Sequence, residues 1–93
     1  MSIPKILVTG ANGQIGRVLT EALRNVYGND AVLATDITKL ETTKEPFEFL
    51  DILNNQRLRE IVEDHKITQI YHLAAILSAN GEWNPIKTWN INL

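Results

Sequence analysis

A chain of 93 residues with a formal net charge of −2 holds at most one small domain, and its 44% hydrophobic and 22% charged residues are those of an ordinary globular protein. No cluster of Lys and Arg favours nucleic acid or an anionic membrane as a partner, and the lack of cysteine excludes disulfides, thiol nucleophiles and cysteine-ligated metals. No apolar run approaches the ~20 residues of a membrane span, and residues 1–5 lack the apolar stretch of a signal peptide, so we expect a cytoplasmic protein.

The first third of the chain predicts a strand, a helix and a second strand. Residues 6–8 form a short apolar run typical of a strand that is buried on both faces of a parallel sheet. Residues 31–36 form a second run of this kind, and Gly28 stands where a glycine commonly ends a helix. Between them, apolar residues recur at the spacing of one helix face, which Thr20 and Arg24 do not share. The members of this stripe are Ile15, Val18, Leu19, Ala22, Leu23 and Val26.

The rest of the chain continues the alternation. Residues 37–46 are polar, end in a proline and predict a loop, whereas residues 47–50 predict a short third strand. Asn54 or Asn55 can cap a second helix that ends near His65. This helix carries Leu58, Ile61 and Val62 on one face. Residues 67–73 predict a fourth strand, residues 76–85 a loop, and Pro85 the first turn of a third helix that continues toward Leu93.

A glycine-rich loop joins the first strand to the first helix. Gly10 lets the chain turn out of the strand, Gly13 lets backbone approach a diphosphate, and Gly16 lets the helix pack closely on the strand. Asn12, Gln14 and Ile15 complete the loop, and the N–H groups at the helix start attract negative charge. No Gly-Lys-Ser/Thr follows, which excludes a P-loop triphosphatase. The alternative interpretation is a flexible turn in an unrelated α/β domain.

An acidic residue completes the dinucleotide pattern. Asp36 stands twenty residues after Gly16, at the end of the second strand, where a carboxylate accepts hydrogen bonds from the adenosine ribose. Because the same carboxylate repels a 2′-phosphate, the sequence predicts NAD in preference to NADP. Two alternatives stay open: Asp36 serves only as a local turn or helix cap, or Lys39 meets a 2′-phosphate.

The order of elements predicts an α/β fold, the N-terminal part of a Rossmann-type doubly wound parallel sheet of about four strands in the order 3-2-1-4. A sheet of these four strands alone would leave a buried type of strand uncovered at its edge. Residues 86–93 also stop without a helix-ending signal. We therefore expect residues 1–93 to be an incomplete NAD-binding domain whose remaining part and substrate region are missing.

Three motifs resemble those of the extended short-chain dehydrogenase/reductase family. They are Thr9–Gly16 (TGANGQIG), Asp51-Ile52, and His72–Ala75 (HLAA), in the family's order. The resemblance covers the whole chain and implies NAD as cofactor. It implies that NAD contacts Gly10, Asn12, Gly13, Gln14, Ile15, Gly16, Asp36, Ile37, Asp51, Ile52, Leu73, Ala74, Ala75 and Asn92.

Within that family, residues 75–85, followed by Trp89 and Asn92, are similar to a segment of the short-chain type of L-threonine 3-dehydrogenases. This narrower resemblance implies a small-molecule substrate, L-threonine, which is oxidised to 2-amino-3-oxobutanoate with NAD. It also implies that Ser78 lies beside the nicotinamide and contacts the substrate. Family members of this kind imply a homodimer for the full-length protein.

The family's catalytic Tyr-x-x-x-Lys is absent from the 93 residues. Tyr27 is followed at that spacing by Ala31, and Tyr71 by Ala75, so no residue present is assigned a catalytic role. His65 and His72 have no metal-binding spacing with nearby acids, and we expect a helix-end histidine and a core histidine instead. Two other functions stay open: a nucleotide-sugar epimerase or dehydratase of the same family, and a non-catalytic NAD-binding protein.

Overall fold

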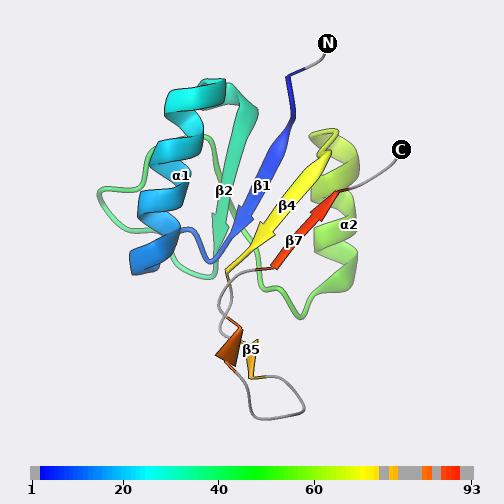
Figure 1. The fold of residues 1–93 in the computed structure, drawn as a ribbon. Helices are drawn as coiled ribbons and strands as arrows, with labels where there is room; N and C mark the ends of the chain where they lie inside the picture. Colours follow the sequence, from blue (N-terminus) through cyan, green and yellow to red (C-terminus); the bar gives the residue numbers. More distant parts are fainter. Residues whose placement is uncertain (1–2, 74–75, 78–82, 85–86, 91–93) are drawn as a thin grey trace.

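A parallel sheet forms the centre of the protein. The computed structural model describes residues 3–73, 76–77, 83–84 and 87–90. Its main sheet has the strand order β3-β2-β1-β4-β7, in which the first four strands are parallel and β7 is antiparallel to β4 (Figure 1). The strands are β1 (Ile6–Thr9), β2 (Val32–Asp36), β3 (Phe47–Phe49), β4 (Gln69–His72) and β7 (Lys87–Asn90). The predicted α/β fold and the 3-2-1-4 order of the parallel strands are confirmed.

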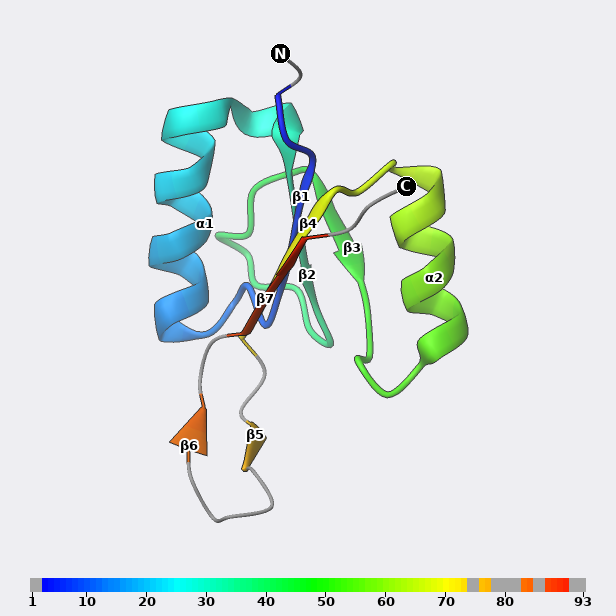
Figure 2. The ribbon, with the colours of Figure 1, turned by 45° about the vertical axis from the view of Figure 1, so that its right-hand side comes forward.

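Two helices lie on opposite faces of this sheet. Figure 2 shows the sheet nearly edge-on between α1 (Gln14–Tyr27) and α2 (Asn55–Asp64). As predicted, α1 ends at Gly28, whose φ of 97° suits glycine, and α2 begins at Asn54, whose side chain accepts a hydrogen bond from the Arg57 N–H (3.0 Å). A 3₁₀ turn, η1 (Asn29–Ala31), takes the place of the first residue predicted for the second strand. Over the described ranges, neither helix has the length and apolar character to cross a membrane.

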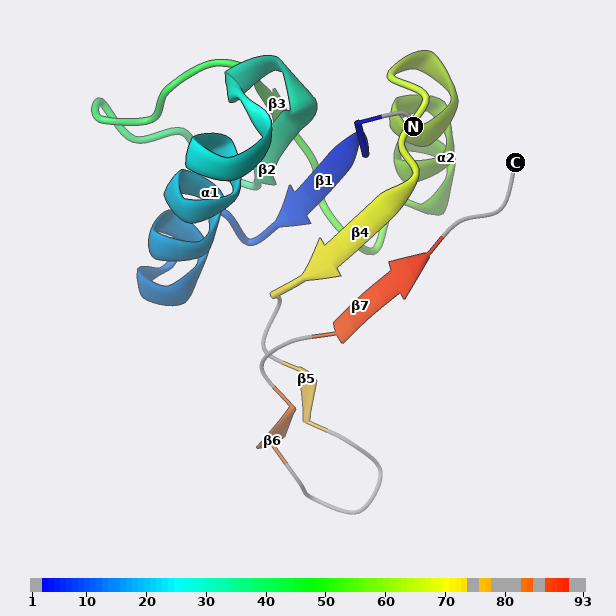
Figure 3. The ribbon, with the colours of Figure 1, turned by 45° about the horizontal axis from the view of Figure 1, so that its top comes forward.

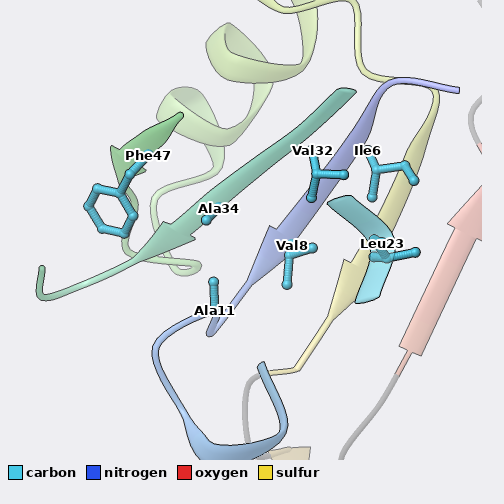
Figure 4. Packing of buried hydrophobic residues seen from close by; sticks show 7 residues of the cluster. All are labelled: Ile6, Val8, Ala11, Leu23, Val32, Ala34 and Phe47. Atoms are coloured by element: carbon cyan, nitrogen blue, oxygen red, sulfur yellow. The ribbon is translucent and has the colours of Figure 1, made fainter. Parts of the chain in front are cut away.

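The core has one layer on each face of the sheet. Alternate residues of a strand point to opposite faces, and here both faces are covered, so all four residues of β1 are buried. On the α1 face, Leu23 packs over β1 and β2 (Figure 4), in a cluster of Ile6, Val8, Ala11, Leu23, Val32, Ala34 and Phe47. On the α2 face, Ile61 lies in a second cluster with Leu7, Leu33, Leu50, Ile67 and Ile70, and Leu58 and Val62 pack against it as predicted.

The helix face predicted for α1 is confirmed only in part: Leu23 is buried and Leu19 packs against the core, but other members of the predicted stripe are exposed. Ile15, Val18 and Val26 are exposed by 52%, 70% and 72%, whereas Thr20, outside the predicted stripe, is buried. The residues of α1 that lie against the sheet are Gly16, Thr20 and Leu23. The reason is steric: Gly16 touches the backbone that leaves β1, and this contact turns its own side of the helix toward the sheet.

The two predictions for the end of the chain are wrong. β5 (Ile76–Leu77) and β6 (Trp83–Asn84) pair in an antiparallel ladder where a loop was expected, and they lie beyond the carboxyl ends of the parallel strands (Figures 1 and 3). Residues 87–90 form a strand instead of a helix. Thr88 and Trp89 favour strands, and β7 pairs with the edge of β4 that would otherwise present unpaired backbone groups.

Candidate functional site

The candidate site lies where the parallel strands end. β1, β2 and β4 point to the same edge of the sheet, and α1 begins at that edge (Figure 1). In open sheets of this kind, ligands bind outside the carboxyl ends of the strands. They bind at the point where two neighbouring strands connect to helices on opposite faces of the sheet. Here β1 lies between β2 and β4, the chain passes from β1 to β2 through α1, and α2 precedes β4 on the other face. The edge therefore combines the glycine loop, Asp36 and Leu73.

Two of the three loop glycines are required by the chain itself. Gly10 has a φ of 68°, a left-handed conformation that other residues adopt only at a cost. A Cβ on Gly16 would lie 2.2 Å from the Gly10 carbonyl oxygen and 2.8 Å from the Ala11 Cα, which is closer than any real contact. These two positions confirm the turn and the close packing that the sequence predicted.

Gly13 differs from the other two. Its φ of −71° is open to any residue, and a Cβ there would meet only the Gly10 carbonyl oxygen, at an ordinary 3.4 Å. Among the residues that the structure describes, nothing therefore requires glycine at this position. Because glycine has no side chain, the backbone beside the start of α1 is open to close approach by a diphosphate.

The N-terminus of α1 offers backbone N–H groups and the partial positive charge of the helix dipole. Intrahelical bonding begins with the Arg17 N–H, which donates to the Gly13 carbonyl (3.0 Å), so the N–H groups of residues 14–16 have no acceptor within the helix. No side chain caps this end, and its first turn holds no acidic residue. The geometry fits an anion bound by backbone N–H groups at a helix N-terminus.

Backbone groups on two sides hold the carboxylate of Asp36. The Asn12 N–H donates to its Oδ2 (3.0 Å) and the Ile37 N–H to its Oδ1 (2.7 Å). The bond to Asn12 links the end of β2 to the glycine loop, so Asp36 does more than cap its own turn. A carboxylate has about four acceptor positions, and each oxygen keeps one for a ribose hydroxyl. Ile37, the next predicted contact, is exposed by 68%.

Asn12 ties the glycine loop to the loop that follows Asp36. Its Nδ2 donates to the Thr38 carbonyl, and its Oδ1 accepts a hydrogen bond from the Thr43 hydroxyl (3.1 Å). Farther along, Lys39 donates to Glu45 Oε1 and forms an ion pair with it. This hydrogen bond, and next the one from the Phe47 N–H, hold the pKa of Glu45 below its ordinary value. No sequence pattern indicates the contact between Asn12 and Thr43, because that contact depends on the path of the loop.

A buried polar pair fixes the end of β4. Thr9 Oγ1 and His72 Nδ1 lie 2.6 Å apart, and both residues are buried. The Leu73 N–H donates to the Thr9 carbonyl (3.2 Å) and is also 3.3 Å from Thr9 Oγ1. The prediction that His72 is a core residue is confirmed. Its partner was not predicted, although Thr9 and His72 lie at matching positions of neighbouring strands.

Ile52, one of the predicted NAD contacts, lies near this pair. Ile52, Thr9 and His72 take part in lining a cavity of about 180 Å³. The side chain of Asp51 accepts a hydrogen bond from the Leu53 N–H (2.9 Å) and so shapes the turn before α2. Ala74, Ala75, Ser78 and Asn92 lie outside the described residues.

The described part of the site has the features of a binding site, and none of its residues is assigned a catalytic role. No three His, Cys, Asp or Glu side chains of the described ranges come together as metal ligands. His65 ends α2, as expected, with its Nε2 3.6 Å from Glu48 Oε1. The arrangement therefore suits a bound anion and a ribose, and the Tyr-x-x-x-Lys pattern is absent from the sequence.

Comparison with known proteins gives a family match and close relatives. Residues 6–93 match a model described as the NAD dependent epimerase/dehydratase family. The chain is 45% identical over 93 residues to an uncharacterized epimerase/dehydratase of Staphylococcus haemolyticus and to another of Staphylococcus aureus (strain USA300). Each alignment covers 96% of this chain and 29% of the relative, so the chain spans less than a third of the length of these relatives.

Several solved structures of similar fold are described as L-threonine dehydrogenases. The Trypanosoma brucei enzyme is 39% identical with a TM-score of 0.76, over 86% of this chain and 26% of its own. A GalE-like L-threonine dehydrogenase from Cupriavidus necator, in its holo form, is 44% identical with a TM-score of 0.74, over 84% and 26%. A monomeric L-threonine 3-dehydrogenase from a metagenome is 49% identical with a TM-score of 0.73, over 83% and 25%.

Proposed function

Because the chain belongs to the NAD dependent epimerase/dehydratase family, we propose that it supplies the adenosine and diphosphate part of an NAD site in an L-threonine 3-dehydrogenase. The observation that carries the proposal is Gly13, a glycine that the described chain does not require, beside a helix start whose N–H groups lack acceptors. NAD, when bound, accepts the hydride from the substrate. The residues of this chain bind and orient it.

The predicted contacts that the structure describes take distinct roles in this proposal. The N–H groups of residues 14–16 bind the diphosphate, and Asp36 accepts hydrogen bonds from the ribose hydroxyls. Lys39 is engaged with Glu45, which supports NAD over NADP. Ile37, Ile52 and Leu73 line the adenine side, and Asp51 shapes its turn. We extend the proposal to Ala74, Ala75 and Asn92 as further NAD contacts and to Ser78 as the contact with L-threonine.

The identity of the substrate rests on the solved relatives. Three L-threonine dehydrogenases share 39–49% of the aligned residues with this chain. We therefore propose the NAD-linked oxidation of L-threonine by a cytoplasmic protein in which other residues supply the acid/base. A homodimer is the proposed assembly, and the relative described as monomeric makes a measurement of the solution mass the direct test.

A second candidate function is favoured by the names of the curated relatives. Both Staphylococcus proteins are described as epimerase/dehydratases, which favours a nucleotide sugar as substrate and NAD as a recycled cofactor. A non-catalytic NAD-binding protein is the third possibility.

Turnover by the full-length protein separates these functions. The protein is incubated with NAD and either L-threonine or a UDP-sugar, while NADH absorbance and the sugar products are followed. We expect NADH only with L-threonine. Conversion of a UDP-sugar without net NADH would establish the second function, and NAD binding without turnover of either would establish the third.

A further inference from the structure

A half-buried arginine in the last turn of α1 contacts the loop between β2 and β3. Arg24 donates from Nη2 to the carbonyls of Val32 (3.0 Å) and Pro46 (2.7 Å), and from Nη1 to the carbonyl of Lys44 (3.2 Å). One side chain thus joins the start of β2 to the last residues before β3. No functional role for Arg24 is apparent from the sequence, because the residue falls outside the apolar stripe of its helix.

The chemistry of these contacts requires arginine. A planar guanidinium presents several N–H donors in a fixed geometry, whereas the ammonium of lysine is a single point on a flexible stem. Burial lowers the pKa of Arg24, and the charge of Glu45 opposes this shift. Within the described residues, Nε is buried without a hydrogen-bond partner. The partial burial of this charge is unfavourable by itself, and the three carbonyl contacts offset it.

Polar contacts hold the loop, since packing beneath it is incomplete. A cavity of about 530 Å³ lies between α1 and residues 42–44, and Asn12, Arg24 and Thr43 are among its lining residues. Segment 42–44 therefore does not rest on a continuous apolar layer. Asn12 holds the part of the loop at Thr38 and Thr43, and Arg24 holds the part at Lys44 and Pro46.

The loop held in this way begins at the ribose-binding carboxylate. Asp36 is followed directly by residues 37–46, and the same Asn12 that donates to Asp36 from its backbone contacts Thr38 and Thr43 with its side chain. Contacts therefore connect Arg24, through Lys44 and the adjacent Thr43, to Asn12 and to Asp36. We propose that Arg24 is a positioning residue for the adenosine half of NAD. This inference rests on the proposed NAD site and adds a residue that does not touch the cofactor.

The test compares cofactor affinities of full-length variants by calorimetry, with NAD and AMP as probes. For Arg24→Met we expect both dissociation constants to rise about tenfold, in line with the loss of hydrogen bonds from a charged group. Arg24→Lys should not restore the affinity, because one ammonium cannot bond all three carbonyls. The kcat at saturating NAD should stay near that of the wild type, which separates positioning from a loss of folded protein.

The matched control is Arg59→Met. Arg59 is exposed on α2, and within the described residues its side chain makes no hydrogen bond or ion pair, so its replacement should leave both affinities unchanged. Thr43→Val should weaken NAD binding by itself. In the double variant with Arg24→Met, the loss of binding free energy should be smaller than the sum of the two single losses, since both residues act on one loop. If Arg24→Met does not fold, Arg24→Lys and Thr43→Val carry the same test.

Each outcome has one meaning. Wild-type affinity for NAD and AMP in Arg24→Met, or in both substitute variants, would overturn the positioning role and leave the NAD site intact. Additive effects of Arg24 and Thr43 would also overturn it, because they would show independent actions. A wild-type protein that binds neither NAD nor AMP would remove the proposed function itself, and the inference with it.

Discussion

Gly13 and Gly16 lie three residues apart, and the presence of glycine has a different explanation at each position. At Gly16 the chain leaves no room, because an added Cβ would lie 2.2 Å from the Gly10 oxygen. At Gly13 the described chain leaves room, and the proposed NAD site attributes the glycine there to the ligand. This difference can be measured.

Replacing each glycine by alanine separates the two demands. We expect Gly13→Ala to keep the unfolding free energy of the wild type and to weaken NAD binding at least tenfold, because its methyl group occupies the space of the diphosphate. Gly16→Ala should instead destabilise the fold by roughly 1–3 kcal/mol, the range for overpacking. Chemical denaturation and calorimetry of both full-length variants check this, and equal NAD affinity for wild type and Gly13→Ala would refute the ligand-based explanation.

The contribution of the Thr9 hydroxyl to stability can also be measured. Thr9→Val keeps the shape but leaves His72 Nδ1 without this partner in a buried position, which costs about 1–3 kcal/mol of unfolding free energy. The control is Thr42→Val, at an exposed loop position, which should change stability by less than about 0.5 kcal/mol. Equal stability of the two variants in urea denaturation would show that the polar pair is dispensable.

At the scale of elements, predictions from the sequence succeeded where the pattern is local. Apolar runs predicted the parallel strands, and Asn54 and Gly28 marked helix ends by their own hydrogen bonds and dihedral angles. For α1 the apolar spacing predicted the buried face only in part, because the spacing alone does not specify which edge of the apolar stripe packs against the sheet. The local pattern failed at residues 87–90, where Pro85 suggested a helix start and pairing with β4 decided the outcome.

The loop of residues 37–46 was predicted as a loop, but its attachments were not. Asn12 and Arg24 contact it across 20–31 positions of sequence, and no local pattern encodes such contacts. The glycine pattern and Asp36 could be found because diphosphate and ribose require fixed spacings. The attachments of the following loop through Thr43 and Arg24 could be found only from the structure.

The ion pair in this loop predicts a pH dependence. The pKa of Glu45 is lowered in the folded chain, so its stabilising contribution is complete above the ordinary value of 4.5 and disappears as the pH falls through the lowered folded value. Stability measured against pH should therefore fall more steeply on the acid side for the wild type than for Glu45→Gln. Parallel curves for the two proteins would show that Glu45 contributes nothing through this ion pair.

At the scale of the whole molecule, the chain matches only part of each of its longer relatives. It covers 29% of the curated relatives and 25–26% of the solved threonine dehydrogenases described above. In the proposed function, the described edge of the sheet binds a diphosphate and a ribose, and the acid/base comes from other residues, because this sequence contains no Tyr-x-x-x-Lys. Binding and turnover are therefore separable properties.

The most direct measurement is the affinity of the full-length protein for NAD and for NADP, each titrated into the wild type and into Asp36→Ser. We expect the wild type to bind NAD at least tenfold more tightly than NADP, because the Asp36 carboxylate accepts hydrogen bonds from ribose hydroxyls and repels a 2′-phosphate. The variant should lose most of this preference. Equal or tighter binding of NADP by the wild type, or no binding of either, would contradict the account.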